Sequence, residues 1–254
     1  MSFTTVRFWK GPRLLAGMLL CWASAAHPAP PPAPPASWGG GWGFVGAAST
    51  DTNLPRVLLI GDSILNGYRG VVVRELADKA NIDVWLNPVH QGSPELHEQL
   101  KAVMAQGPYD VVHFNMGLHG FDEGRSRIPE DQFRPLTRKL VATIREGAPK
   151  ARLIWASSTP MTRAGKPTEL EPENDRIILA HNQMAAEVMG EWQIPINDLY
   201  ALMLDKLQLG RGDTVHWQPA GSAVQGQAVA SVIEQQLKTK SSKALTPTPV
   251  IAPR

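Results

Sequence analysis

The 254-residue chain is poor in cysteine and in net charge: Cys21 is its single cysteine, and the formal net charge is +2. If Cys21 leaves with a cleaved leader, the mature chain has no cysteine, which excludes disulfides, a cysteine nucleophile and thiolate metal sites. So small a charge, without any basic run interleaved with aromatic residues, argues against a nucleic-acid partner. Charge therefore does not identify the substrate.

The chain also lacks an apolar run long enough to cross a membrane. Its N-terminal apolar stretch, 14–22, is short; it follows three basic residues and precedes the small residues 23–26. This order is typical of a secretory signal peptide, so we expect residues 1–26 to be cleaved and the protein to be secreted or periplasmic. The alternatives are a buried N-terminal helix and a lipoprotein site at Cys21, and the bulky Leu20 argues against the second.

Composition divides the rest of the chain into three parts. Residues 27–53 are expected to be a linker, rich first in Pro and Ala and then, over 37–46, in Gly and Trp. The aromatic side chains of 37–46 either pack on the domain or form an adhesive arm, and packing is the simpler expectation. A folded domain is expected over 54–240, followed by a disordered tail over 241–254, which has no apolar periodicity.

Within the domain, short apolar runs alternate with segments of helical spacing. The runs predict strands buried on both faces, and the helical segments predict their connections. The expected strands are 57–60, 82–86, 110–115, 152–156 and 194–197; the expected helices are 71–80, 94–104, 129–145, 175–192 and 222–238. This alternation predicts a parallel sheet covered by helices on both faces. Right-handed crossovers then place the C-terminal ends of all strands on one rim of the sheet.

The first strand leads directly into Gly61-Asp62-Ser63. A serine at this position lies where open α/β sheets bind their ligands, and Gly61 lets the backbone turn sharply there. Three residues alone are a weak signal, because Asp62 and Ser63 are equally suited to cap a helix. A serine hydroxyl also needs a base before it acts as a nucleophile.

Asp213 and His216 supply such a base near the other end of the domain. Their spacing of three residues allows the carboxylate to accept a hydrogen bond from the imidazole and to hold its tautomer, which leaves the second ring nitrogen for Ser63. The alternative is a loop histidine with a local capping contact. Taken with Ser63, the pair indicates a nucleophile, a general base and an orienting carboxylate.

These two segments, in this order of elements, resemble the SGNH/GDSL hydrolase family over about residues 54–238. Gly61-Asp62-Ser63-Ile64 is similar to the family's nucleophile block, with Ile64 where Leu is usual, and Asp213-Thr214-Val215-His216 is similar to its Asp-x-x-His block. The resemblance implies an α/β/α three-layer sandwich with a five-stranded parallel, flavodoxin-like sheet. It also implies an esterase or O-deacetylase with Ser63, His216 and Asp213 as its triad.

The family's oxyanion donors are a glycine N–H and an asparagine side chain, besides the N–H of the nucleophile. The resemblance implies Ser63 and Gly92 as backbone donors and Asn115, at the tip of the third strand, as the side-chain donor. The chain departs from the family here, because Gly117-Leu118-His119-Gly120 stands where Gly-x-Asn-Asp is usual. An alignment on Gly117 would put His119 in the asparagine position. We take Asn115 as the donor and His119 as a pocket residue.

Other candidate groups point to weaker interpretations. The histidines outside the triad pair, His90, His97, His113 and His119 among them, form no His-Glu-x-x-His pattern, so we expect neither a metal nor a cofactor. His113, inside an apolar strand, is expected to be a core residue. Trp217 follows His216 and is expected to line the substrate pocket.

We therefore expect an exported serine esterase that hydrolyses short-chain acyl esters, with acetyl groups on carbohydrate as the favoured substrates. The triad implies the acyl chemistry, whereas the carbohydrate depends on the resemblance and on export. Two alternatives remain: an O-acyltransferase acting on a cell-envelope polysaccharide, and a non-catalytic binding domain on the same fold. The sequence barely separates the first alternative from a hydrolase, because only the acceptor alcohol or water differs.

Overall fold

The computed structural model describes residues 1–2, 39–49, 51–122 and 124–243. Nearly all of the expected signal peptide therefore lies outside the described residues, as do the first part of the linker and the tail from 244 on. Within them, no helix is long and apolar enough to cross a membrane.

A six-stranded sheet forms the centre of the domain. Its strands, in spatial order, are β1 (Gly43–Val45), β3 (Asn81–Leu86), β2 (Arg56–Gly61), β4 (Val111–Phe114), β7 (Arg152–Ala156) and β10 (Ile196–Asn197). From β3 to β10 all neighbours are parallel. The order of these five strands is the flavodoxin-like one, so the expected fold class is confirmed.

The sixth strand corrects two expectations. The expected sheet had five strands and the expected linker extended to residue 53, but β1 pairs antiparallel with β3 and places Phe44 opposite Trp85. This edge pairing also settles how the aromatic residues after residue 38 behave: Phe44 and Trp42 pack against the two hydrophobic cores. The folded unit therefore begins before the expected boundary at residue 54.

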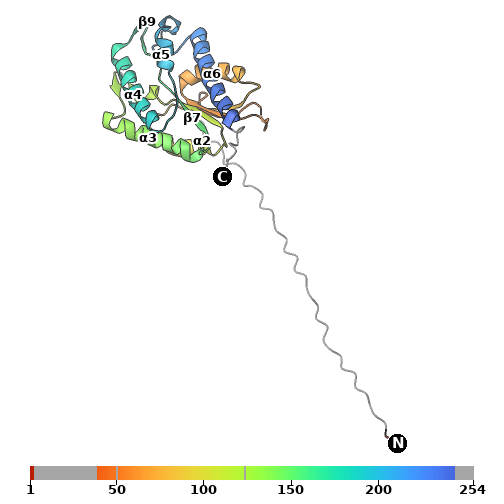
Figure 1. The fold of residues 1–254 in the computed structure, drawn as a ribbon. Coiled ribbons are helices and arrows are strands. Elements are labelled where there is room, and N and C mark those ends of the chain that lie inside the picture. The colour runs from red at the N-terminus through yellow and green to blue at the C-terminus, as the bar shows by residue number, and fades with distance from the viewer. Residues whose placement is uncertain (3–38, 50, 123, 244–254) are drawn as a thin grey trace, which may run out of the picture. The chain divides into compact units, whose positions relative to one another are not determined.

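Helices cover both faces of the sheet (Figure 1). On one face, α2 (Leu96–Met104), α3 (Glu130–Gly147) and α4 (Pro172–Glu191) pack on Leu58, Ile60 and their neighbours. On the other face, α1 (Ser63–Glu75) and α6 (Pro219–Lys243) pack on Val57, Leu59 and their neighbours. Successive residues of β2 thus enter opposite cores, which explains its uninterrupted apolar run.

Glycines bring α1 and α6 into close contact. A Cβ at Gly226 would lie 2.5 Å from Cβ of Val71, closer than two carbon atoms pack, so a side chain there would force the helices apart. Near the start of both helices, a Cβ at Gly67 would lie 3.3 Å from Oγ of Ser222. This close approach places the first turn of α6 beside the first turn of α1.

Several element boundaries differ from those expected. α1 begins at Ser63 rather than at 71, and α6 continues to Lys243, past the expected start of the tail at 241. A short helix, α5 (Leu199–Leu204), and two hairpins, β5–β6 (Phe121–Asp122, Arg125–Ser126) and β8–β9 (Thr162–Arg163, Lys166–Leu170), were not predicted. Three of the four hairpin strands have only two residues, too few to show alternation, and none of the five residues of β9 is buried, so the sequence pattern misses them.

Buried histidines make the stability of this fold depend on pH. His113 on β4 is fully buried with its Nε2 3.2 Å from Nδ2 of Asn197, and burial lowers its pKa to about 3. Burial likewise lowers the pKa of His181 to about 4. Each histidine binds a proton in the unfolded chain below pH 6.5, but binds it in the native state only at much lower pH.

The free energy of unfolding should therefore fall as the pH is lowered from 6.5, by about 1.4 kcal/mol per pH unit for each histidine. Urea unfolding curves at pH 7, 6 and 5 measure this slope. Glutamine does not titrate, so the His113→Gln protein should lose the contribution of one histidine to this slope. An unchanged slope in a folded His113→Gln protein would contradict the assignment.

Candidate active site

The candidate nucleophile lies where the strand order of the sheet reverses. The chain leaves β2 toward β3 on one side and later returns to β4 on the other, so the C-terminal end of β2 faces a crevice that open α/β sheets use for ligands. Asp62 caps α1 by accepting a hydrogen bond from the N–H of Ile64 (2.9 Å). Ser63 is the first residue of the helix, so its N–H has no partner within the helix. The residue that caps the helix therefore directly precedes the candidate nucleophile, which begins the helix.

Ser63, His216 and Asp213 form a continuous hydrogen-bonded chain. Nε2 of His216 lies 2.9 Å from Oγ of Ser63, and Nδ1 of His216 lies 3.1 Å from Oδ2 of Asp213. The second carboxylate oxygen of Asp213 accepts the backbone N–H of His216 at 2.9 Å. This double contact holds the imidazole with one nitrogen toward the carboxylate and the other toward the serine.

The loop that carries His216 is anchored to the β8–β9 hairpin. The carbonyl of Thr214 accepts hydrogen bonds from the N–H (2.9 Å) and hydroxyl (3.3 Å) of Thr162. Thr214 has a φ of 86°, an unusual conformation for a β-branched residue that its surroundings must hold in place. The hairpin therefore positions the base, although nothing in its own sequence marks it as part of a site.

Charge around Asp213 favours its ionised form. Partial burial opposes ionisation, but the backbone N–H and ring of His216, together with Arg211, hold the pKa of Asp213 below its usual range. Nη2 of Arg211 lies 3.0 Å from Oδ2 of Asp213, the same oxygen that faces His216. The carboxylate therefore stays charged and able to stabilise an imidazolium.

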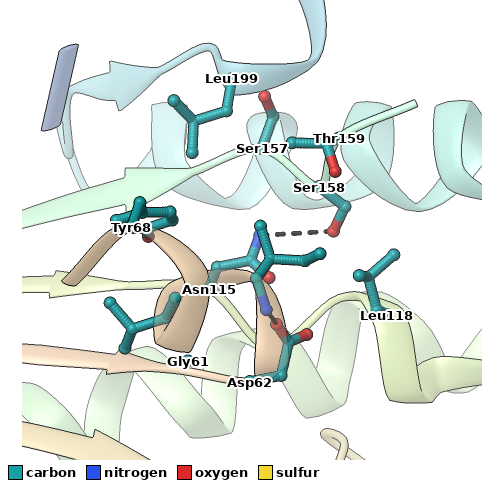
Figure 2. A pocket seen from close by; sticks show the side chains of 11 residues that line it. Gly61, Asp62, Tyr68, Asn115, Leu118, Ser157, Ser158, Thr159 and Leu199 are labelled. Carbon is teal, nitrogen blue, oxygen red and sulfur yellow. Dashed lines mark hydrogen bonds between the residues drawn. The ribbon is translucent and has the colours of Figure 1, made fainter. Parts of the chain in front are cut away.

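Asp62 has a different environment, because it is only 5% exposed. Burial raises the pKa of its carboxyl, against the opposing effects of the Ile64 N–H, His119 and His216. Its Oδ2 has no hydrogen-bond partner among the described residues. It lines a cavity of about 20 Å³, close to the volume that one water molecule requires, together with Asn115 and Ser158 (Figure 2).

Asn115 does not present its amide to the nucleophile as we expected. Its Nδ2 donates to the carbonyl of Ala156 (2.5 Å) and to Oγ of Ser158 (3.3 Å), while its Oδ1 accepts the N–H of Gly117 (2.8 Å); Figure 2 shows the contact with Ser158. Both amide hydrogens are thus committed to the end of β7. Asn115 joins β4 to β7 in this structure, and the sequence gives no indication of which way its side chain points.

The N–H of Gly92 also has a hydrogen-bond partner. Its N–H donates to Nδ1 of His90 at 3.1 Å, within a turn closed by the hydrogen bond from Ser93 N to the His90 carbonyl. The expected glycine donor therefore faces a local acceptor and not the nucleophile. Of the three expected oxyanion donors, only the N–H of Ser63 has no hydrogen-bond partner within the described part of the chain.

His119 lies on the short helix η1 (Leu118–Gly120) that follows β4, and its charge acts on the same Asp62 carboxyl as that of His216. None of the described residues accepts or donates a hydrogen bond at its ring. The ring contacts Trp42 edge-on, with centroids 5.9 Å apart and an interplanar angle of 79°. Trp42 was not among the expected site residues, because it precedes the domain in the sequence and joins the site only through β1.

Trp217, expected to line the pocket, is largely buried. Its Nε1 donates to Oγ1 of Thr159 at 3.3 Å, which joins the His216 loop to the segment after β7. It lines, with Ser63 and His216, a cleft of about 170 Å³. Within residues 39–49, 51–122 and 124–243, no group of three or more histidine, cysteine, aspartate or glutamate side chains is placed to hold a metal ion.

No protein-family model matches the chain, and no curated protein matches it in sequence. Solved structures do match its fold. An aryl esterase from M. smegmatis superposes with a TM-score of 0.59 at 15% identity, covering 72% of this chain and 99% of its own. An acetyl xylan esterase gives a TM-score of 0.57 at 16% identity, and the match covers 70% of this chain and 99% of the esterase. A carbohydrate acetylesterase from Sinorhizobium meliloti gives a TM-score of 0.57 at 14% identity, and the match covers 71% of this chain and 99% of the acetylesterase.

The chain thus has the same α/β/α fold as these esterases, and about seven tenths of it covers each of them almost from end to end. At such low identity the likeness concerns the fold. The chemistry of this chain has to be argued from its own site.

Proposed function

We propose that the protein is a serine esterase that hydrolyses short-chain acyl esters, acetyl esters foremost, with Ser63 as nucleophile, His216 as general base and Asp213 as its orienting carboxylate. The observation that carries the proposal is the hydrogen-bonded chain Ser63–His216–Asp213 at the reversal point of the sheet. The esterases and acylhydrolases among the solved structures of the same fold support the reaction type.

In this mechanism Oγ of Ser63 attacks the ester carbonyl carbon while its proton passes to Nε2 of His216. The tetrahedral intermediate collapses when the imidazolium gives that proton to the alcohol oxygen, so the alcohol leaves and the acyl group stays on Ser63. Water, deprotonated by His216, then attacks the acyl-enzyme. The acid is released and Ser63 regains its proton.

The developing oxyanion needs donors aimed at it. The N–H of Ser63 is one donor, since it starts α1 and the positive end of the helix dipole adds to it. For the side-chain donor we propose His119 in place of Asn115. The amide of Asn115 is committed to Ala156 and Ser158, whereas the ring of His119 has no hydrogen-bond partner among the residues that the structure describes.

His119→Ala should accordingly lower kcat by about 10²–10³ with little change in KM, as expected for a donor that acts mainly on the transition state. Asn115→Ala should instead act through the loop that it holds, and should lower thermal stability together with activity. Steady-state kinetics and melting curves of both variants separate the two roles. A collapse of kcat in a fully stable Asn115→Ala protein, with His119→Ala unaffected, would restore the original assignment.

The choice of a short acyl group is supported by neighbours of the same fold. Two of them are named as an acetyl xylan esterase and a carbohydrate acetylesterase. The N-terminal pattern adds export to the proposal, with the enzyme acting in the periplasm or outside the cell.

Hydrolysis of 4-nitrophenyl esters of increasing acyl length, followed by acetate release from acetylated xylan, tests this function. We expect kcat/KM to be highest for acetate and to fall steeply by octanoate. No hydrolysis of any ester by the folded protein would contradict the proposal. Transfer of acetyl to an added alcohol faster than to water would instead favour the acyltransferase.

A further inference from the structure

The cleft of about 170 Å³ beside the nucleophile lies between the first turn of α1 and the first turn of α6. Ser63 and His216 form one part of its lining, and Asn66 and Ser222 form another. Gly67 faces Ser222 across this contact, where a Cβ would lie 3.3 Å from the serine hydroxyl. A side chain at residue 67 would therefore narrow the cleft.

The position of His216 identifies which part of an ester would occupy this cleft. The imidazole that deprotonates Ser63 must next hand the proton to the alcohol oxygen, so that oxygen lies within hydrogen-bond reach of Nε2. A cleft lined by both Ser63 and His216 therefore lies on the alcohol side of the reacting carbon. The small cavity lined by Asp62 shares Ile64 with this cleft, but its lining includes neither Ser63 nor His216.

Two polar side chains in this lining have no partner of their own. Ser222 is only 9% exposed, and its hydroxyl makes no hydrogen bond to any described residue. Asn66, one helical turn after Ser63, is exposed, and its amide also has no hydrogen-bond partner in the described ranges. Both groups line the cleft without an internal partner, so each is free to hydrogen-bond a ligand there in place of water.

Arg211, Trp217 and Ile64 also line the cleft. The guanidinium of Arg211 is 62% exposed and contacts Asp213 through one nitrogen, which leaves it further N–H donors. The largely buried indole of Trp217 supplies an apolar wall. Donors and a hydroxyl around one aromatic wall suit an alcohol that carries further hydroxyl groups better than they suit an alkyl chain.

We infer that this cleft is the alcohol subsite, and that Ser222 and Asn66 hydrogen-bond hydroxyl groups adjacent to the ester bond. The preferred substrates are then acetyl esters of polyhydroxylated alcohols such as sugars. The inference rests on the proposed esterase function and adds to it the residues that select the alcohol.

A matched pair of esters isolates this selectivity. 2-Hydroxyethyl acetate and propyl acetate share the acyl group and chain length and differ only by a hydroxyl in place of a methyl. Acetate release is measured for wild type, Ser222→Ala, Asn66→Ala and Ser231→Ala. Ser231 lies on the exposed side of the same helix, outside the cleft, so Ser231→Ala makes the same chemical change as Ser222→Ala without touching the subsite.

For each ester, kcat/KM is divided by its rate of alkaline hydrolysis, which corrects for intrinsic reactivity. The ratio of the corrected values, hydroxyethyl ester over propyl ester, should exceed one in wild type. Ser222→Ala and Asn66→Ala should each lower this ratio by about three- to tenfold, the effect of one hydrogen bond, whereas Ser231→Ala keeps the wild-type ratio. Equal ratios in wild type and both cleft variants, with both esters hydrolysed, would overturn the subsite and leave the esterase standing. Failure to hydrolyse either ester would contradict the esterase itself, and the subsite with it.

Discussion

Ser63→Ala is expected to reduce ester hydrolysis by several orders of magnitude without unfolding the protein. The hydroxyl that is 2.9 Å from His216 is the nucleophile of the proposed mechanism, and the base has nothing to activate once it is removed. In a serine protease the corresponding loss was about 2 × 10⁶ in kcat, which sets the scale. Residual activity from the oxyanion donors and from substrate binding should remain above the uncatalysed rate.

Covalent labelling provides an independent measurement of the same assignment. A fluorophosphonate should modify wild type at one site, which peptide mass spectrometry should locate at Ser63. Ser157→Ala serves as the matched control, because Ser157 also follows a parallel strand but donates its hydroxyl to Asp198 (2.8 Å). A folded Ser63→Ala protein that keeps most of its activity, or labelling at another serine, would refute the triad.

His216→Ala should cost nearly as much as the loss of Ser63, whereas Asp213→Ala should cost less. The imidazole moves the proton in both halves of the reaction, and the carboxylate orients and stabilises it. In subtilisin the carboxylate alone was worth about 3 × 10⁴ in kcat against about 2 × 10⁶ for the histidine. Measuring kcat for both variants with 4-nitrophenyl acetate gives the comparison.

Arg211 adds a feature specific to this site. Without Asp213, its guanidinium would remain beside His216 with no carboxylate between the two charges, and would disfavour the imidazolium. Asp213→Ala/Arg211→Ala should therefore be more active than Asp213→Ala alone. Equal activity of His216→Ala and Asp213→Ala, both well folded, would contradict the assigned roles.

The sequence predicts the five parallel strands from a strong local signal, and it predicts the pairing of Ser63 with His216 and Asp213 from two short motifs that are informative only together. A strand buried on both faces is apolar throughout, and the two short motifs stand where strand ends and crossovers bring them to one rim. Their hydrogen bonds follow from this topology. The residues that hold them in place, such as Thr162 and Thr214, have no such signal.

The expected oxyanion donors illustrate what a pattern of residue types does not contain. Asn115 lies at the predicted strand tip, but its amide turns toward Ala156 and Ser158, at and just after the end of the neighbouring strand β7. That choice depends on the close approach of two loops, which Gly117 permits: a Cβ at Gly117 would overlap Oγ of Ser158. Side-chain direction is decided by such tertiary contacts, and a single sequence does not reveal them.

The antiparallel pairing of β1 decides where a shortened recombinant form of the protein can begin. All six residues of β3 are buried, and β1 covers the outer edge of that strand. A protein started at residue 54 would expose this edge, with a row of backbone N–H and C=O groups ready to pair with a second molecule. The same cut would remove Trp42 from beside His119. Proteolytic trimming before β2 should therefore cause aggregation and loss of activity together.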